Sequence, residues 1–122
     1  MKGTNTIDDA IGQAEGYLTM GMAMDALKTL KGLPAGLEND QRVLELQLEC
    51  LCHQFAWEET VRLCESVTAE LSPLALFWLG VARCQCGDVL EARRALGRAI
   101  ELDAGFRERI VSEPLLESIW RN

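Results

Sequence analysis

The sequence predicts an all-α fold made of helix-turn-helix hairpins. Between Pro73 and Asp103, apolar residues recur at spacings of three and four, as one buried face of a helix requires. Gly87 divides this segment where one helix should end and the next should begin. A small side chain recurs near the start of the second helix of each hairpin, at intervals of 34 and 32 residues; these positions are Ala26, Thr60 and Ala92.

The last hairpin contains each signal that such a unit needs. Ser72 is a suitable cap for its first helix, and Pro73 lies in the first turn, where a missing N–H costs nothing. Asp88 begins a capping-box sequence that ends at Glu91. The predicted inner faces consist of Leu76, Leu79, Ala82, Val89, Ala92, Leu96, Ala99 and Leu102.

Two earlier segments repeat this design. The first places Gly21 at its turn, in the position of Gly87. The middle copy departs most, because Leu48 replaces the small residue at Gly80 and Phe55 replaces the turn glycine. We therefore expect a single domain, 1–122, with hairpins at about 7–34, 41–72 and 73–104 and a helical cap at about 105–121.

The last hairpin also follows a known order of residues: a Leu-Gly pair, a turn glycine, and then alanine, leucine and alanine in the second helix. These residues are Leu79, Gly80, Gly87, Ala92, Leu96 and Ala99, followed by Ile100-Glu101-Leu102-Asp103. In this order they resemble a tetratricopeptide repeat. Ala104 stands where the family has a closing proline, and Arg83 stands where an aromatic is usual. The resemblance implies a right-handed α-solenoid of three repeats plus a cap, whose first helices line a concave groove that holds a peptide.

The composition suits a globular chain without a basic surface. With 48% hydrophobic and 25% charged residues, the 122-residue chain should fold, and its net charge of −7 argues against nucleic acid or anionic membrane as a partner. Asp8, Asp9, Gln13 and Glu15 interrupt the first twenty residues, so we expect no signal peptide. Five cysteines within helical patterns fit the reducing cytoplasm better than a disulfide framework.

The sequence predicts no catalytic centre, metal site or cofactor. Cys50 and Cys52, like Cys84 and Cys86, are two residues apart, about 200° around a helix, so neither pair can chelate one ion. We expect these thiols to be packed in the core. His53, the single histidine, has no nucleophile or base placed beside it by a motif. A non-enzymatic role in protein binding is therefore expected.

The outward positions of the first helices are the expected binding surface. Phe77 and Trp78 cannot both enter the same core as Leu76 and Leu79, because four consecutive positions surround a helix. At least one of these aromatics should be exposed or covered by something. Aromatic surface beside acid would bind an apolar or amphipathic peptide that carries Lys or Arg. The predicted peptide-binding residues are Leu74, Phe77, Trp78, Val81, Glu15, Glu45, Leu46 and Glu49.

Three alternatives remain for this surface. The carboxy-terminal tail, through Leu115, Leu116 and Trp120, would cover Phe77 and Trp78, or two copies of the chain would bury them in a homodimer. Small tetratricopeptide-like chaperones of bacterial secretion systems are similar in size and in their apolar groove, although no motif selects them. Binding of an acidic peptide tail, as in repeats that clamp heat-shock chaperones, is disfavoured because glutamates and apolar residues occupy the groove positions.

Overall fold

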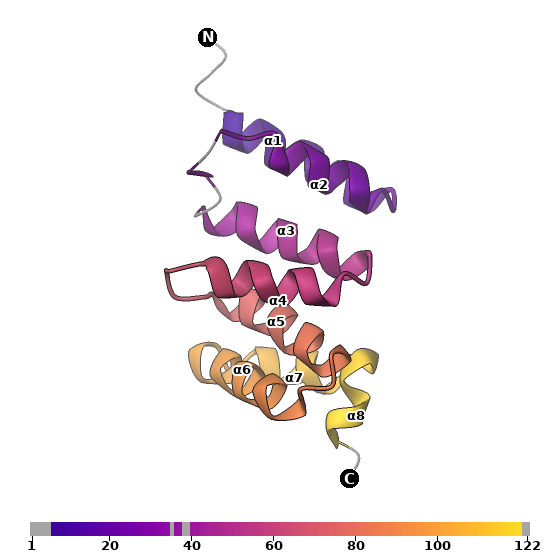
Figure 1. Ribbon diagram of the computed structural model, residues 1–122, viewed down its shortest axis with the longest axis vertical. Helices are drawn as coiled ribbons and strands as arrows, with labels where there is room; N and C mark the ends of the chain where they lie inside the picture. Colours follow the sequence, from indigo (N-terminus) through magenta and orange to yellow (C-terminus); the bar gives the residue numbers. More distant parts are fainter. Residues whose placement is uncertain (1–5, 35, 38–39, 121–122) are drawn as a thin grey trace. The chain divides into compact units, whose positions relative to one another are not determined.

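Helices make up every regular element that the structure describes. This computed structural model describes residues 6–34, 36–37 and 40–120 (Figure 1). The helices are α1 (Thr6–Thr19), α2 (Ala23–Lys31), α3 (Gln41–His53), α4 (Trp57–Ser66), α5 (Pro73–Gln85), α6 (Val89–Leu102), α7 (Phe106–Val111), the 3₁₀ helix η3 (Pro114–Leu116) and α8 (Glu117–Trp120). The all-α prediction is confirmed; residue 121, the expected end of the cap, lies outside the described residues. Within those residues, no helix has the length and apolar character needed to cross a bilayer.

The chain divides into two compact units, residues 1–55 (unit 1) and 56–122 (unit 2). The boundary follows Phe55, so it falls inside the middle predicted hairpin. Helix α3 therefore belongs to unit 1 and helix α4 to unit 2. The single domain expected from the sequence stays a prediction.

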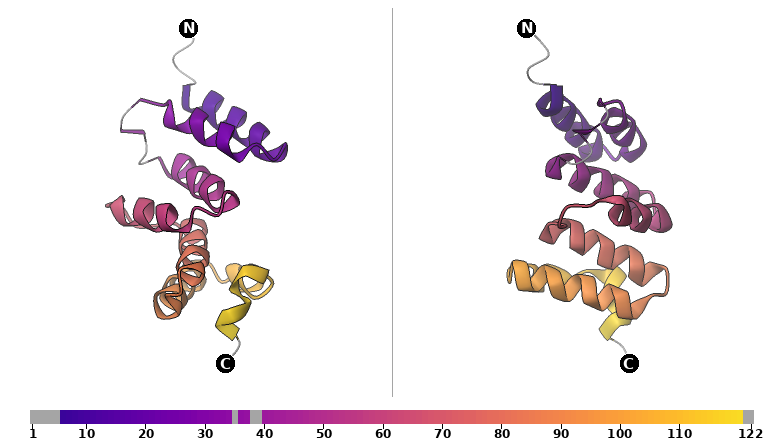
Figure 2. Two further views of the ribbon diagram at one scale, coloured as in Figure 1. Left: turned by 45° about the vertical axis from the view of Figure 1, so that its right-hand side comes forward. Right: turned by 60° about the vertical axis from the view of Figure 1, so that its left-hand side comes forward.

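Unit 1 consists of the α1–α2 hairpin followed by α3, which packs against both helices (Figure 2). Helices α1 and α3 run in the same direction, because α2 returns the chain between them (Figure 1). The buried apolar residues of unit 1 are Ala10, Ala14, Ala26, Leu27, Leu30, Val43, Leu44, Leu46, Leu48, Cys50, Leu51 and Cys52.

Unit 2 is organised around α5, which packs against α4, α6, α7 and η3. Eight consecutive residues of α5, 75–82, are buried, so every side of this helix is covered. Gly80 allows α6 to approach closely: a Cβ at this position would lie 2.5 Å from Cγ of Leu96. Such a separation is far inside van der Waals contact, so a larger residue here would require the Leu96 side chain to move.

The three turns between first and second helices share one backbone conformation. Gly21, Phe55 and Gly87 have φ angles of 75°, 59° and 87°. The N–H of each donates to a carbonyl three residues earlier at 3.0 Å. Left-handed backbone normally requires glycine, so Phe55 occupies the place of a turn glycine at an energetic cost. The residues that follow the turns also agree, with φ between −104° and −87° and ψ between 63° and 73°; they are Met22, Ala56 and Asp88.

The recurring small residues lie four positions after these caps and are completely buried. Ala26, Thr60 and Ala92 each have 0% exposure, and each donates its N–H to the carbonyl of its cap residue at 3.0 to 3.1 Å. Thr60 fits a position that alanine fills elsewhere because its hydroxyl donates to the carbonyl of Ala56 at 2.9 Å. Its polar group is therefore satisfied inside the core.

Two caps of the last hairpin compare directly with the sequence predictions. Ser72 accepts a hydrogen bond from the N–H of Ala75 at 3.2 Å, as expected. Asp88 accepts from the N–H of Glu91 at 3.3 Å, but the Glu91 carboxylate binds Arg94 at 2.7 Å instead of returning to Asp88. The capping box is therefore only half formed, because Arg94 offers Glu91 a charged donor.

Candidate peptide-binding surface

The aromatic half of the predicted surface lies in the core of unit 2. Phe77 is 0% exposed, Trp78 is 9% exposed, and Val81 is also fully buried. Leu74, at the start of α5, is half-buried. These residues therefore do not form an open groove, which corrects the expectation of an accessible patch. The cause is the helices packed around α5; a binding role for these residues stays a prediction.

Helix α7 covers the two aromatic rings. The ring centroids of Phe77 and Trp78 are 5.1 Å apart in an edge-on arrangement, and Phe106 lies 6.3 Å from Phe77. The guanidinium carbon of Arg109 lies 4.5 Å from the centroid of Phe77 and 5.5 Å from that of Trp78. A cation at this distance from an aromatic ring is attracted by the negative face of the ring. Helix α7 thus places both an apolar ring and a cation on the predicted surface.

The end of the chain also folds against α5, but at a different place from the one expected. The carbonyl of Leu115 accepts from Nε2 of Gln85 at 2.6 Å and from Sγ of Cys84 at 3.7 Å. Leu116 is fully buried, whereas Trp120 is 53% exposed. The tail therefore covers the last turn of α5, and α7 covers the aromatic rings. Arg109 is exposed although its guanidinium lies over the rings; its spacing of three from Phe106 was the one available signal for this placement.

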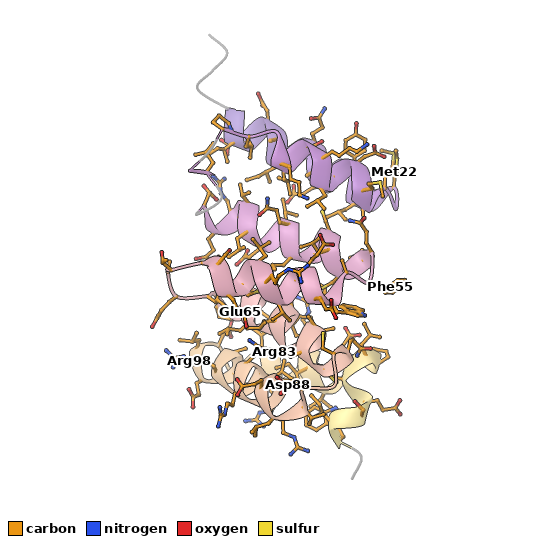
Figure 3. All side chains as sticks on the ribbon, viewed as in Figure 1. Met22, Phe55, Glu65, Arg83, Asp88 and Arg98 are labelled. Carbon is orange, nitrogen blue, oxygen red and sulfur yellow. The ribbon has the colours of Figure 1, made fainter. Side chains whose placement is uncertain are left out.

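Arg83, at the position where the resemblance in sequence predicts an aromatic residue, joins two elements of unit 2. Its Nη2 lies 3.1 Å from Oε2 of Glu65 in α4, and its Nη1 lies 3.6 Å from Oδ2 of Asp88 (Figure 3). The Arg83 side chain is 20% exposed, so solvent screens these pairs only in part. A polar bridge from α4 to the α5–α6 turn thus replaces the expected ring.

The acidic half of the predicted surface lies in unit 1. Glu15 on α1 is exposed, and Glu45 and Glu49 on α3 are half-buried. Leu46 is only 9% exposed, so it belongs to the core and not to a surface. The sequence-predicted residues therefore fall into two groups, one in each unit.

An exposed ion pair shows which sides of α1 and α3 face each other. Nη1 of Arg42 is 3.0 Å from Oδ1 of Asp8, 34 positions earlier in the chain. Because seven residues span about two helical turns, Glu15 lies on the Asp8 side of α1 and Glu49 lies on the Arg42 side of α3. Glu45, three residues after Arg42, shares that side. We call Glu15, Glu45 and Glu49 the acidic face.

Arg42 lies on the same side of α3 as Glu45 and Glu49, and two further residues of α3 contact these glutamates. Nε2 of His53 lies 3.7 Å from Oε2 of Glu49, and Nε2 of Gln41 donates to Glu45 at 3.4 Å. Glu15 forms no ion pair with any other residue in the described ranges. The face therefore presents negative charge to solvent, and it can attract a basic group.

Arg42 also holds Asp40, the cap of α3. Asp40 accepts from the N–H of Arg42 at 2.9 Å, and the two side chains lie 3.3 Å apart. The side-chain hydrogen bond from Arg42 lowers the pKa of the Asp40 carboxyl below its usual value of 3.8. The same pairing raises the pKa of Arg42. Asp40 therefore stays ionised where it caps the helix.

The cysteines have the properties of packed thiols, with one exception. Cys50, Cys52, Cys64 and Cys84 are buried, and burial raises the pKa of Cys50 to about 11. Cys86 is exposed, which corrects the expectation of packing, and partial burial with nearby Glu58 still raises its pKa. Because a thiolate is the reactive form, neither Cys50 nor Cys86 is activated as a nucleophile. The described residues contain no group of three His, Cys, Asp or Glu side chains that could hold a metal ion.

Comparison with protein-family models, with curated proteins and with solved structures finds no match to this chain.

Proposed function

We propose that this chain is a tetratricopeptide-like, non-enzymatic protein-interaction module of the cytoplasm. The recurring turns at Gly21, Phe55 and Gly87, with similar left-handed backbone angles, support three repeats of one design. The completely buried small residues that follow them support the same design. A right-handed solenoid of these repeats is part of the proposal.

The ligand of this module is a basic, apolar or amphipathic peptide or helix. The observation that carries this step is the register of α1 and α3, shown by the contact of Asp8 with Arg42, which supports gathering of the acidic face on one side of unit 1. Carboxylates on a fixed pair of helices steer a Lys- or Arg-bearing ligand and set its position. Half-buried Ile11, three residues after Asp8 on the same side of α1, offers apolar contact beside them.

The aromatic residues of α5 have a different part in this proposal. Phe106 and Arg109 already supply the ring and the cation that a ligand would bring to Phe77 and Trp78. In this conformation the contacts to the ligand therefore fall to the acidic face. A homodimer through Phe77 and Trp78 is less favoured, because both side chains are buried within unit 2.

Fluorescence anisotropy with a short labelled helical peptide of leucine and lysine tests the acidic face. We expect this peptide to bind the wild-type protein and the same peptide with glutamate in place of lysine not to bind. The double variant Glu15→Lys/Glu49→Lys should weaken binding by at least about tenfold, because two attractive charges become repulsive.

The matched control is Glu59→Lys/Glu108→Lys, which changes the net charge equally at exposed positions of α4 and α7. Circular dichroism should first show that both variants keep their helices. Binding by the control within about twofold of wild type supports the acidic face. Equal weakening in both variants would mean that net charge alone attracts the peptide, and no binding of either peptide to wild type would overturn the proposed function.

A further inference from the structure

A pocket with apolar walls opens between α6, α7 and α8 in unit 2. Its volume is about 290 Å³, at the lower end of the range for pockets that hold small organic ligands. Its walls present almost no polar surface. The apolar side chains that line it are Leu96, Ile100, Ile110, Val111, Ile119 and Trp120.

The carbon stems of two arginines, Arg93 and Arg107, complete the lining of this pocket, and because both residues are exposed their charged groups lie toward solvent at its edge. Nη2 of Arg93 donates to the carbonyl of Ile119 at 3.0 Å, so it binds α8 to α6 without a carboxylate partner. Arg107 has neither an ion pair nor a hydrogen bond from its side chain to another residue in the part of the chain that the structure describes. These two cations are therefore not neutralised by acidic residues of the described chain.

Other arginines on α6 do have carboxylate partners. Arg94 lies 2.7 Å from Glu91, and Arg98 lies 3.3 Å from Glu101. Both of these pairs lie outside the pocket lining. Positive charge without a carboxylate partner on α6 thus coincides with the apolar pocket, which is the combination that binds an anion with an apolar tail.

We propose that this pocket binds a small amphipathic anion, a medium-chain alkyl carboxylate. The alkyl tail lies among the apolar side chains, and the carboxylate is bound at the arginine side, chiefly by Arg107, which has no competing partner among the described residues. The volume corresponds to about ten groups of the size of a water molecule, which suits a tail of about eight to ten carbons. This site is separate from the acidic face, which selects the opposite charge, and does not depend on the proposed peptide binding.

Isothermal titration calorimetry with three probes tests the charge preference of the pocket. Decanoate, decanol and decyltrimethylammonium share one alkyl tail and differ in the charge of the head. We expect decanoate to bind with one-to-one stoichiometry, decanol to bind about tenfold more weakly, and the ammonium compound to bind weakest. Methyl NMR with decanoate should shift the signals of Ile110 and Ile119 and leave Leu44 and Leu48 of unit 1 unchanged.

Three variants locate the site. Arg107→Gln should weaken decanoate binding by about tenfold and leave decanol unchanged, because only the charged head uses this residue. Arg94→Gln is the matched control, since Arg94 lies on α6 outside the pocket lining and should leave both affinities unchanged. Gly97→Leu should abolish binding of both compounds, because Gly97 lines the pocket and a Cβ there meets no atom within 4 Å.

Four results would overturn the proposal. Equal affinity for the three probes would mean that the pocket ignores charge. Equal effects of Arg107→Gln and Arg94→Gln would remove Arg107 from the site, and unchanged decanoate binding in Gly97→Leu would place the ligand elsewhere. Shifts of the Ile110 and Ile119 methyls by an acidic amphipathic peptide, with none by decanoate, would assign the pocket to a protein partner instead.

Discussion

The α1–α2 and α5–α6 hairpins turn the chain in the same way but bury their first helices differently. In both turns a glycine adopts left-handed backbone, and the next N–H returns to a carbonyl five residues earlier; these bonds are Met22 to Tyr17 at 2.8 Å and Asp88 to Arg83 at 2.9 Å. Among residues 7–19 of helix α1, whose burial the structure describes, only Ala10 and Ala14 are buried. Helix α5 buries eight consecutive residues. The turn conformation is thus determined by residues close in the sequence, whereas the burial of a helix depends on its tertiary packing.

The neighbours of each helix explain this difference. Helix α1 packs against α2 and α3, whereas α5 packs against α4, α6, α7 and η3. The position of Gly80 in α5 corresponds to Ala14 in α1, so the last hairpin has the smaller residue where α5 meets α6. The comparison teaches that one turn sequence can serve either an outer or a fully enclosed helix.

The largest expected effect of a substitution is at Phe77. Phe77→Ala should lower the free energy of unfolding by about 3–5 kcal/mol, because it removes a fully buried ring from the middle of α5. Leu18→Ala, at a half-buried position of α1, should cost only about 1 kcal/mol. Urea denaturation followed by circular dichroism measures both values. Similar losses for the two variants would contradict the difference in burial between α5 and α1.

The glycines of the two first helices should respond in opposite directions to alanine. Gly80→Ala should lower the free energy of unfolding by about 1–3 kcal/mol, because the alanine Cβ would overlap Leu96. Gly12→Ala in α1 should raise the free energy of unfolding by about 0.5–1 kcal/mol, because a Cβ there meets no atom within 4 Å and alanine favours a helix. Both values come from urea denaturation, and a gain at Gly80 would show that α5 and α6 do not approach closely.

Local signals in the sequence were sufficient for the helices and turns. The glycines at 21 and 87, the cap at Ser72 and the apolar spacing of three and four each act within a few residues, so the positions of most helices could be predicted. The prediction of a complete capping box was wrong because Arg94 binds the Glu91 carboxylate, although Arg94 is only three residues away in the sequence. The boundary after Phe55 could not be predicted, since it depends on packing between segments far apart in the sequence.

The candidate site was less predictable for the same reason. The sequence predicted that at least one of Phe77 and Trp78 would be exposed or covered by something; both are buried, together with Leu76 and Leu79. It did not identify α7 as the cover, because that depends on where a short helix packs after Asp103. The burial of Leu46 likewise depends on tertiary packing, which the sequence pattern did not predict.

The turn at Phe55 offers a smaller test of the shared backbone conformation. Phe55→Gly should raise the free energy of unfolding by about 0.5–1 kcal/mol, because it relieves the left-handed strain at a side chain that is 71% exposed. Gly87→Ala, at the corresponding turn, should lower it by about 1 kcal/mol. Thermal and urea unfolding of the two variants provide the values. Destabilisation by Phe55→Gly would mean that contacts of the Phe55 ring outweigh its backbone strain.

The smallest expected effect distinguishes the caps of α3 in unit 1 and α5 in unit 2. Asp40 and Ser72 each accept a backbone N–H at the start of a helix, so Asp40→Ala and Ser72→Ala should each cost about 1 kcal/mol at neutral pH. Only Asp40 titrates, and its pKa in the folded protein lies below 3.8 because Arg42 binds the ionised form. A carboxyl group whose pKa is lower in the folded than in the unfolded protein stabilises the folded state. This contribution is present in full above the pKa of the unfolded state, and it is lost as the pH falls through the pKa of the folded state.

The cost of Asp40→Ala should therefore shrink as the pH falls below about 4, by a fraction of 1 kcal/mol, because the Arg42 side chain is 56% exposed and solvent screens the pair. The cost of Ser72→Ala should stay constant over the same range, since a hydroxyl does not titrate there. Urea denaturation at a series of pH values from neutral to acid measures the two differences from wild type. A constant cost for both variants would show that Arg42 does not stabilise the Asp40 carboxylate. A falling cost for both would show that acid weakens the helices by a process common to the two units.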